Sequence, residues 1–455
     1  MSVLVEKADL SLRYAGHYNE VKNLLWQNSS DILNAGRKKA FQDFVLQGIP
    51  TRKNENYKYT NLQPHFFPDY IFEHLRKPVE VDLNAVFRCD VPQLDTYLAF
   101  IFNGWYYENN HQTLNLPGNV LLAGLEEISL KTPELLKKYG QLADTSSDPL
   151  VALNTAYAKD GYFLYVPKNT VLEKPIQLIN FLQSDYDTFV TQRNFIYLEE
   201  GADLKIITCD HTLNLNKYLN NSVTEIFVGP NASIEYYALQ NQHNNTTSLN
   251  SVFIYQQKDS EVTTLNSSLH GGLIRNNLNI ILDGENSSAN MFGMAFTDRR
   301  QHVDNFTKVF HAKPHCQSNQ IYKTVLDDNS TGVFSGRIHV MRDAQKTNAF
   351  QRSNNLLLTD KATMQAKPQL IIDADDVKCS HGATIGQIDE EALFYLRARG
   401  IEEKQARLML MNAFAHEVIQ QIKIIPLRNR IDELVDKRLK GEVARCHDCA
   451  YNCEN

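Results

Sequence analysis

The feature that most constrains the fold is a quasi-repeat of short strands between residues 150 and 388. Clusters of polar turn residues precede a small or branched residue that opens a strand, and Ala202, Ala232 and Val262 lie 30 residues apart. Ala289 follows after 27 residues and Gly332 after another 43, a length that could hold two shorter turns. A repeat of about 20–30 residues with strands and no helices indicates a β-solenoid, whose stacked coils bury their inward side chains. Because the spacing is irregular, a β-sandwich is the alternative.

Helical patterns flank this strand-rich region. Asp31 is expected to cap an N-terminal helix, which Gly48 ends. On the other side, Asp389 is a suitable N-cap, because Glu390 and Glu391 in the next turn would face the positive end of the helix dipole. The sequence therefore predicts a helical segment before the strands and another after them.

Two more helices are expected near the C-terminus, over about 402–421 and from Pro426 onward. Both have broad apolar faces, and Leu410, Phe414 and Val418 form one stripe of the first. Packing within the chain is the default interpretation of such faces. Binding to a partner protein is the sharper alternative.

These patterns divide the chain into five parts. They are an N-terminal helical domain (1–95), a connecting segment (96–149), a β-helix core (150–388), a C-terminal helical domain (389–445) and a cysteine-rich tail (446–455).

Composition argues against several classes of protein. The formal net charge of −7 shows no basic excess, so we expect no nucleic-acid binding. No apolar run approaches the roughly 18 residues that span a bilayer, and the N-terminus lacks a signal-peptide core, so we expect no membrane association. The seven cysteines are an odd number and mostly scattered, unlike a disulfide framework. We therefore expect a cytoplasmic protein with reduced thiols.

Cys379 and His381 are the first candidates for chemistry. In a strand, residues i and i+2 face the same way, separated by roughly 6.5–7 Å along the strand. A thiolate beside an imidazole suits a borderline metal, or a cysteine nucleophile with its base. Two ligands are too few for a closed structural zinc site, but they could form half of a site that another chain completes. A buried cysteine beside a hydrogen-bonded histidine fits the same spacing, and spacing alone favours it.

Asp373, Asp375 and Asp376 suggest a second hypothesis. Clustered acids on a β-solenoid are typical of polysaccharide lyases and hydrolases, where they hold calcium or act as acid and base. Those enzymes are usually secreted, and no signal peptide is visible here. A solvated turn before the last strand is the favoured interpretation.

The C-terminal tail carries a further candidate metal site. Cys446 and Cys449 form a C-x-x-C pair, and Cys453 follows four residues later. Because no second pair lies nearby, a reduced, redox-sensitive tail is favoured over a closed metal site.

Several segments resemble the SufB/SufD family of iron–sulfur cluster assembly proteins. Residues 48–62 resemble the family's Gly-x-Pro…Glu-x-Trp-Lys-Tyr-Thr pattern, with Tyr57 where tryptophan is usual. The most specific match is residues 375–384, Asp-Asp-Val-Lys-Cys-Ser-His-Gly-Ala-Thr. The other matching segments are residues 152–156, 160–161, 165–168, 298–304, 332–336 and 394–400. The resemblance covers nearly the whole chain.

Within this family, the sequence looks more like the SufD branch than the sister subunit SufB. SufB typically carries Glu-His-Glu-Ala-Thr where residues 380–384 read Ser-His-Gly-Ala-Thr. SufB also often has an upstream C-x-x-C cluster, and none precedes Cys446 here. The cysteine tail departs from the SufD pattern and leaves a ligand role there open.

The resemblance implies a mainly β fold with helical ends, a right-handed parallel β-helix between N- and C-terminal helical domains. It implies a non-catalytic scaffold subunit that pairs with a SufB-like subunit through the end of the β-helix. The C-terminal helices would dock a SufC-like ABC ATPase. His381 would lie beside a SufB cysteine at the nascent-cluster site, and Cys379, two residues away on the same strand, is a further candidate ligand. Reduced flavin is associated with the family's complex, although this chain shows no flavin motif.

Overall fold

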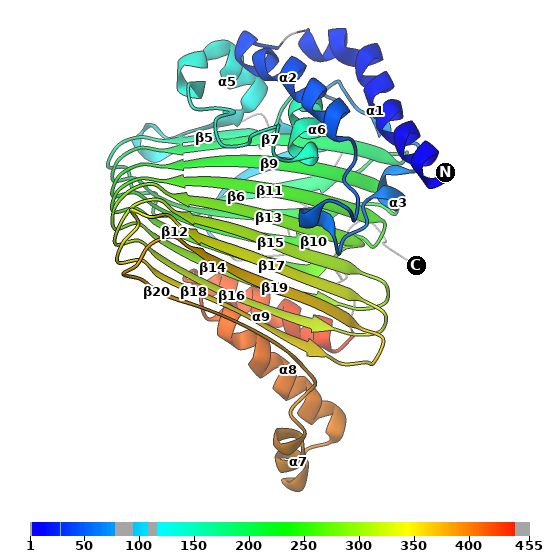
Figure 1. Ribbon diagram of the computed structural model, residues 1–455, viewed down its shortest axis with the longest axis vertical. Coiled ribbons are helices and arrows are strands. Elements are labelled where there is room, and N and C mark those ends of the chain that lie inside the picture. Colours follow the sequence, from blue (N-terminus) through cyan, green and yellow to red (C-terminus); the bar gives the residue numbers. More distant parts are fainter. Residues whose placement is uncertain (1, 28, 78–93, 108–115, 442–455) are drawn as a thin grey trace.

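A parallel β-solenoid forms the centre of the protein (Figure 1). The computed structural model describes residues 2–27, 29–77, 94–107 and 116–441. Strands β5 to β20 alternate between two sheets, so sixteen strands at two per turn make eight turns. Each strand pairs in parallel with the strand two further along the chain, as β14 does with β16. The predicted solenoid is confirmed, and the sandwich alternative is wrong.

Within the described residues, each of the two sheets contains ten strands. The first contains β1 (Ile71–Phe72), β4 (Leu121–Gly124), β5 (Tyr162–Val166), β7 (Thr188–Leu198), β9 (Tyr218–Val228), β11 (Thr246–Gln256), β13 (Leu273–Leu282), β15 (His302–His311), β17 (Thr331–Val340) and β19 (Thr363–Ile372). The second contains β2 (Tyr97–Phe102), β3 (Trp105–Tyr107), β6 (Ile176–Leu182), β8 (Asp203–Thr212), β10 (Ser233–Asn241), β12 (Glu261–His270), β14 (Ser288–Thr297), β16 (Gln317–Leu326), β18 (Asn348–Leu357) and β20 (Lys378–Gly386).

The turns between strands explain the polar clusters of the repeat. Asn231, Asp259 and Asn286 adopt positive φ angles of 55°, 56° and 61°, a conformation that asparagine and aspartate tolerate better than most residues. Gly332 corrects the repeat count. It lies in β17 of the first sheet, whereas Ala289 lies in β14 of the second, so the 43 residues between them make one and a half turns rather than two.

The space between the two sheets, here called the lumen, is packed with both apolar and polar side chains. Ala202, Ala232 and Val262 belong to its apolar cluster. Amide side chains form hydrogen bonds between neighbouring coils. For example, Asn276 accepts a hydrogen bond from Gln240 Nε2 at 2.7 Å and donates one to Asn305 Oδ1 at 3.1 Å. Most of these buried polar groups therefore have partners, which offsets the cost of removing them from water.

The N-terminal helices cover the outer face of the first sheet (Figure 1). They are α1 (Ser2–Trp26), α2 (Asp31–Gln47), α3 (Gln63–Phe66), α5 (Leu125–Lys131) and α6 (Pro149–Tyr157), with short 3₁₀ turns η1 (Glu55–Tyr57), η4 (Pro117–Asn119) and η5 (Pro133–Leu136). The predicted cap of α2 is off by one residue. Ser30 is the N-cap, and its hydroxyl accepts a hydrogen bond from the backbone of Leu33, while Asp31 is the first helical residue.

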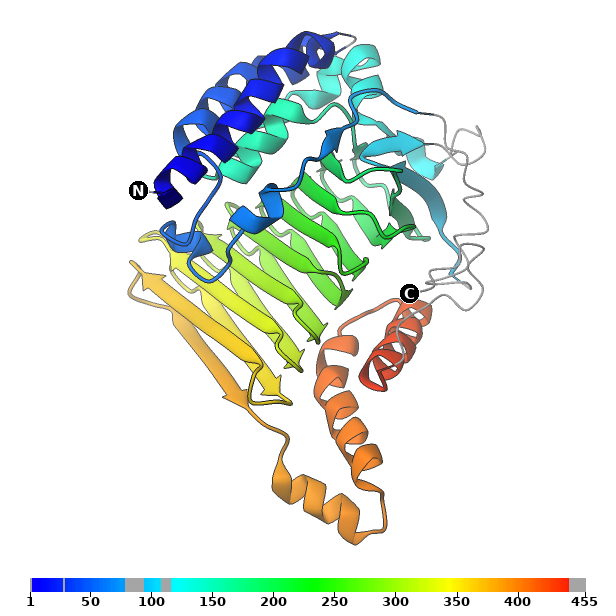
Figure 2. The same ribbon diagram turned by 90° about the vertical axis from the view of Figure 1, so that its right-hand side faces the viewer.

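The C-terminal helices are α7 (Glu390–Ala398), α8 (Glu403–Ile419) and α9 (Ile425–Leu439). The predicted cap at Asp389 is confirmed, since its carboxylate accepts from the backbone of Glu391 and Ala392. Helices α8 and α9 pack on the second sheet, while α7 projects past the end of the solenoid (Figure 2). Among the described residues, no helix is long and apolar enough to cross a membrane.

Candidate functional site

The last coil of the solenoid holds the two main candidate residues on one face. Strand β20 pairs with β18, so Cys379 is in register with Ala349 and His381 with Gln351. Cys379 packs against the apolar cluster of the lumen, and His381, two residues on, lies on the same side of the strand. The structure thus brings the two side chains together on the lumen face.

This last coil is open to solvent. Strand β20 ends the second sheet and β19 ends the first, and neither edge is paired within the described residues. Every residue of β20 is exposed except the half-buried Cys379. Ile385 of β20 is 48% exposed, and Ile371 and Ile372 of β19 are 41% and 42% exposed. An unpaired edge with apolar side chains is a template for another strand.

A polar layer lies directly beneath His381. Gln351 Nε2 donates to Gln320 Oε1 at 3.1 Å, and Thr307 Oγ1 donates to the same oxygen at 2.8 Å. A Cβ at Gly336 would lie 2.0 Å from Gln351 Nε2, so glycine leaves the space that the Gln351 amide occupies. Sequence reasoning missed Gln351. The length of one coil could have identified it, because residues one coil apart stack on each other. Gln320, Gln351 and His381 follow one another at intervals of 31 and 30 residues.

The thiol of Cys379 is less acidic than an ordinary cysteine. Burial raises its pKa, and this outweighs the opposing hydrogen bond from the backbone of Ala349. A thiol with a raised pKa stays protonated near neutral pH, so it would act as a ligand only after a metal displaced its proton. Cys209 and Cys316 are fully buried in the core. Cys89 and the candidate tail ligands Cys446, Cys449 and Cys453 lie outside the described residues.

The acidic residues Asp373, Asp375 and Asp376 lie in the turn between β19 and β20. Asp373 Oδ2 lies 2.9 Å from His339 Nε2, and Asp376 forms an ion pair with Lys346. The backbone N–H of Asp376 also donates to Gln345 Oε1 at 2.9 Å. Within the described residues no group of three or more His, Cys, Asp or Glu side chains could hold a metal ion. Asp373 and Asp376 are therefore engaged in holding the turn.

Two hollows of the structure can be compared with the flavin that the resemblance implies. The lumen cavity is about 40 Å³, far below the 300–1,000 Å³ of typical ligand pockets. An open pocket of about 400 Å³ is lined by Asn244, Gly272, Arg299, Arg300, Gln301, Asp328 and Asn329, with no aromatic ring to stack on a flavin. Neither hollow suits a flavin.

The C-terminal helices turn their main apolar faces toward their own chain. Met411, Val418 and Leu434 are buried against the second sheet. Phe414 is partly buried, with Lys323 Nζ 4.5 Å from its ring centre. The default interpretation, packing within the chain, thus holds for these faces. The exposed aromatic side chains of this region lie instead on α7, where Phe394 is 73% and Tyr395 is 56% exposed.

Comparison with known proteins covers almost the whole chain. Residues 8–178 match the family described as SufBD protein N-terminal region, and residues 181–414 match SUF system FeS cluster assembly, SufBD core domain. An iron–sulfur cluster assembly SufBD family protein of Synechocystis sp. is 30% identical over 400 residues, covering 86% of this chain and 87% of the relative. Iron–sulfur cluster assembly protein SufD of Escherichia coli is 29% identical over 406 residues, covering 88% and 92%. The SufD of Bacillus subtilis is 27% identical over 314 residues, covering 68% and 71%.

Proposed function

The chain belongs to the SufBD family of iron–sulfur cluster assembly proteins, and from that premise we propose that it is a non-catalytic, SufD-type scaffold subunit. It pairs with a SufB-like subunit and docks a SufC-like ATPase. The observation that carries the proposal is the open last coil, where an unpaired edge strand presents His381 and Cys379 on one face.

Pairing uses the open end of the solenoid. A homologous solenoid could add its own edge strands to β19 and β20 and thereby satisfy their free backbone groups. Covering Ile371, Ile372 and Ile385, each nearly half exposed, would add about 1 kcal/mol apiece. The lumen of one subunit would then continue into that of the other.

The nascent cluster is the cargo of this interface. His381 supplies a neutral imidazole, which suits iron, and Cys379 supplies a thiol from the same strand face. Two ligands leave the coordination of iron incomplete, which explains why the site needs residues from the partner. The tail cysteines Cys446, Cys449 and Cys453 would supply extra ligands.

The experiment is co-expression of the chain with SufB-like and SufC-like subunits from the same organism. We expect His381→Ala to leave assembly intact while cluster content, measured by visible absorbance and iron analysis, falls sharply. Cys379→Ala should have the smaller effect. His243→Ala, at a half-buried turn histidine, is the matched control. Normal cluster content in the His381→Ala complex would refute the assigned role, and loss of assembly would favour a structural one.

Docking of the ATPase uses α7 rather than the buried faces of α8 and α9. Phe394 and Tyr395 are the exposed aromatic residues there, and the Arg399 guanidinium lies 4.5 Å from the Tyr395 ring centre. Aromatic and arginine side chains are enriched at the energetic centres of interfaces. Phe394→Asp should abolish co-purification of the ATPase without changing the melting temperature. Leu434→Asp, at a buried position of α9, should instead destabilise the helical domain. ATPase binding unaffected by Phe394→Asp would exclude α7.

A further inference from the structure

Two histidines far from the open coil face each other across the N-terminal domain. His17 Nε2 of α1 and His74 Nε2 of the segment after β1 lie 3.3 Å apart. The two rings are inclined by only 24°, and both lie nearly parallel to the ring of Tyr157, at 10° and 14°. The two imidazoles therefore lie side by side and nearly parallel to the Tyr157 ring, and their Nε2 atoms face each other.

This spacing matches that of two nitrogens bound to one metal ion. Zinc–imidazole bonds are about 2.0–2.1 Å long. An ion about 2.05 Å from both Nε2 atoms would subtend an N–metal–N angle of about 107° at the observed 3.3 Å separation, close to the tetrahedral angle. Burial lowers the pKa of both rings, that of His74 to about 4, so their lone pairs are available at neutral pH.

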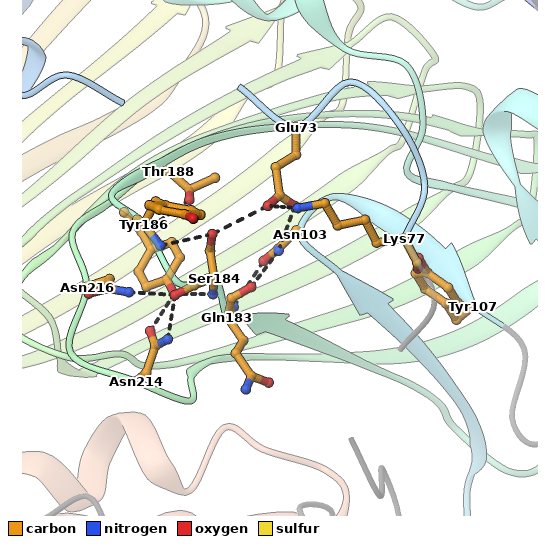
Figure 3. Close-up of polar contacts among 11 residues, drawn as sticks. Glu73, Lys77, Asn103, Tyr107, Gln183, Ser184, Tyr186, Thr188, Asn214 and Asn216 are labelled. Atoms are coloured by element: carbon orange, nitrogen blue, oxygen red, sulfur yellow. Dashed lines mark hydrogen bonds and ion pairs between the residues drawn. The ribbon is translucent and has the colours of Figure 1, made fainter. Parts of the chain in front are cut away.

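The surroundings supply an outer partner and a fixed backbone. Glu20 Oε2 lies 3.9 Å from His17 Nδ1, the nitrogen that would remain free; this is longer than a hydrogen bond, so the carboxylate acts on the site through its charge. The segment carrying His74 is fixed by its neighbour Glu73, which accepts hydrogen bonds from Lys77, Asn103 and Ser184 (Figure 3). The backbone that carries His74 is thus held in place before any ion binds.

We propose that His17 and His74 form a two-histidine site for a borderline divalent transition-metal ion such as Zn²⁺. Water completes the coordination, since both side chains are only half-buried. The ion links helix α1 to the segment 71–77. The two ligands, His17 and His74, are 57 residues apart in the sequence. The site is separate from the open coil and does not depend on the proposed function.

The test is Zn²⁺ titration of the full chain by calorimetry, in a background where Cys446, Cys449 and Cys453 are changed to serine. We expect His17→Gln and His74→Gln each to lose one equivalent of bound Zn²⁺, whereas His243→Gln keeps it. Glutamine retains a hydrogen-bonding side chain, so the variants should fold. Glu20→Gln should weaken Zn²⁺ binding, because it removes a negative charge close to the site.

Two further measurements separate a metal site from a simple histidine–histidine hydrogen bond. Zn²⁺ should raise the melting temperature of the parent chain and not that of either histidine variant, because only the folded pair binds the ion. Co²⁺ should give the intense visible absorption of a tetrahedral complex, again lost in both variants. An unchanged Zn²⁺ stoichiometry in His17→Gln and His74→Gln would overturn the proposal and leave the pair as a hydrogen-bonded tie.

Discussion

Acid should destabilise the protein through His311, an imidazole in the lumen. This side chain is fully buried, and its Nε2 lies 2.8 Å from Ser318 Oγ. Burial lowers the pKa of His311 to about 4, whereas a histidine in an unfolded chain has a pKa of about 6.5. Between these values the unfolded chain binds more protons than the folded one. The free energy of unfolding therefore falls as the pH drops from 6.5 toward 4.

The magnitude follows from the two pKa values. At pH 5 the unfolded histidine is almost fully protonated and the folded one almost neutral, which corresponds to a loss of about 2 kcal/mol relative to pH 7.5. Below pH 4 the loss approaches about 3.4 kcal/mol, the full separation of the pKa values. His311→Gln removes this contribution, because glutamine has no proton to gain, and it retains a group that can bond to Ser318.

The assay is urea denaturation of the parent chain and His311→Gln at pH 7.5 and pH 5.0. His65 and His74 also have pKa values lowered to about 4, but they titrate in both proteins. Comparing the change in the free energy of unfolding between pH 7.5 and pH 5.0 in the two proteins therefore isolates the contribution of His311. We expect the free energy of unfolding of the variant to fall by about 2 kcal/mol less than that of the parent on acidification. Equal losses in the two proteins would refute the argument that burial keeps this ring neutral.

Two substitutions test the packing around the lumen and the first sheet. Gly336→Ala should lower the stability by about 1–3 kcal/mol, because its Cβ would clash with the amide of Gln351. In thermal melts, the Gly336→Ala/Gln351→Ala double variant should recover the melting temperature that Gly336→Ala loses. An unchanged melting temperature in Gly336→Ala would contradict the clash. Glu225→Gln should cost about 3–5 kcal/mol, because it leaves the buried Arg193 guanidinium, 2.7 Å from Glu225 Oε2, without its charge partner. Urea denaturation measures this loss, and a change below about 1 kcal/mol would argue against a charged buried pair.

Local patterns favoured the solenoid architecture but left a β-sandwich open, and the resemblance to the SufB/SufD family favoured the solenoid between helical ends. The period of the strands and the polar turns indicated a solenoid, since each coil must bury its inward side chains against the next. Asp389 was predicted as a cap because its carboxylate reaches backbone N–H groups only two and three residues away. The face shared by Cys379 and His381 followed from the alternation of side chains in a strand. These features depend on neighbours in sequence, which is why one chain suffices to find them.

Other features depend on how distant segments meet, and only the tertiary structure decided them. The apolar faces of α8 and α9 could have met a partner or their own sheet, and the fold covers them with the second sheet. Gln351 lies under His381 because consecutive coils stack in register, a pairing set by the turn lengths of the whole solenoid. His17 and His74 come within 3.3 Å although 57 residues separate them. Alternation and capping act within a few residues, whereas burial and ligand geometry are set by long-range packing, which no local pattern contains.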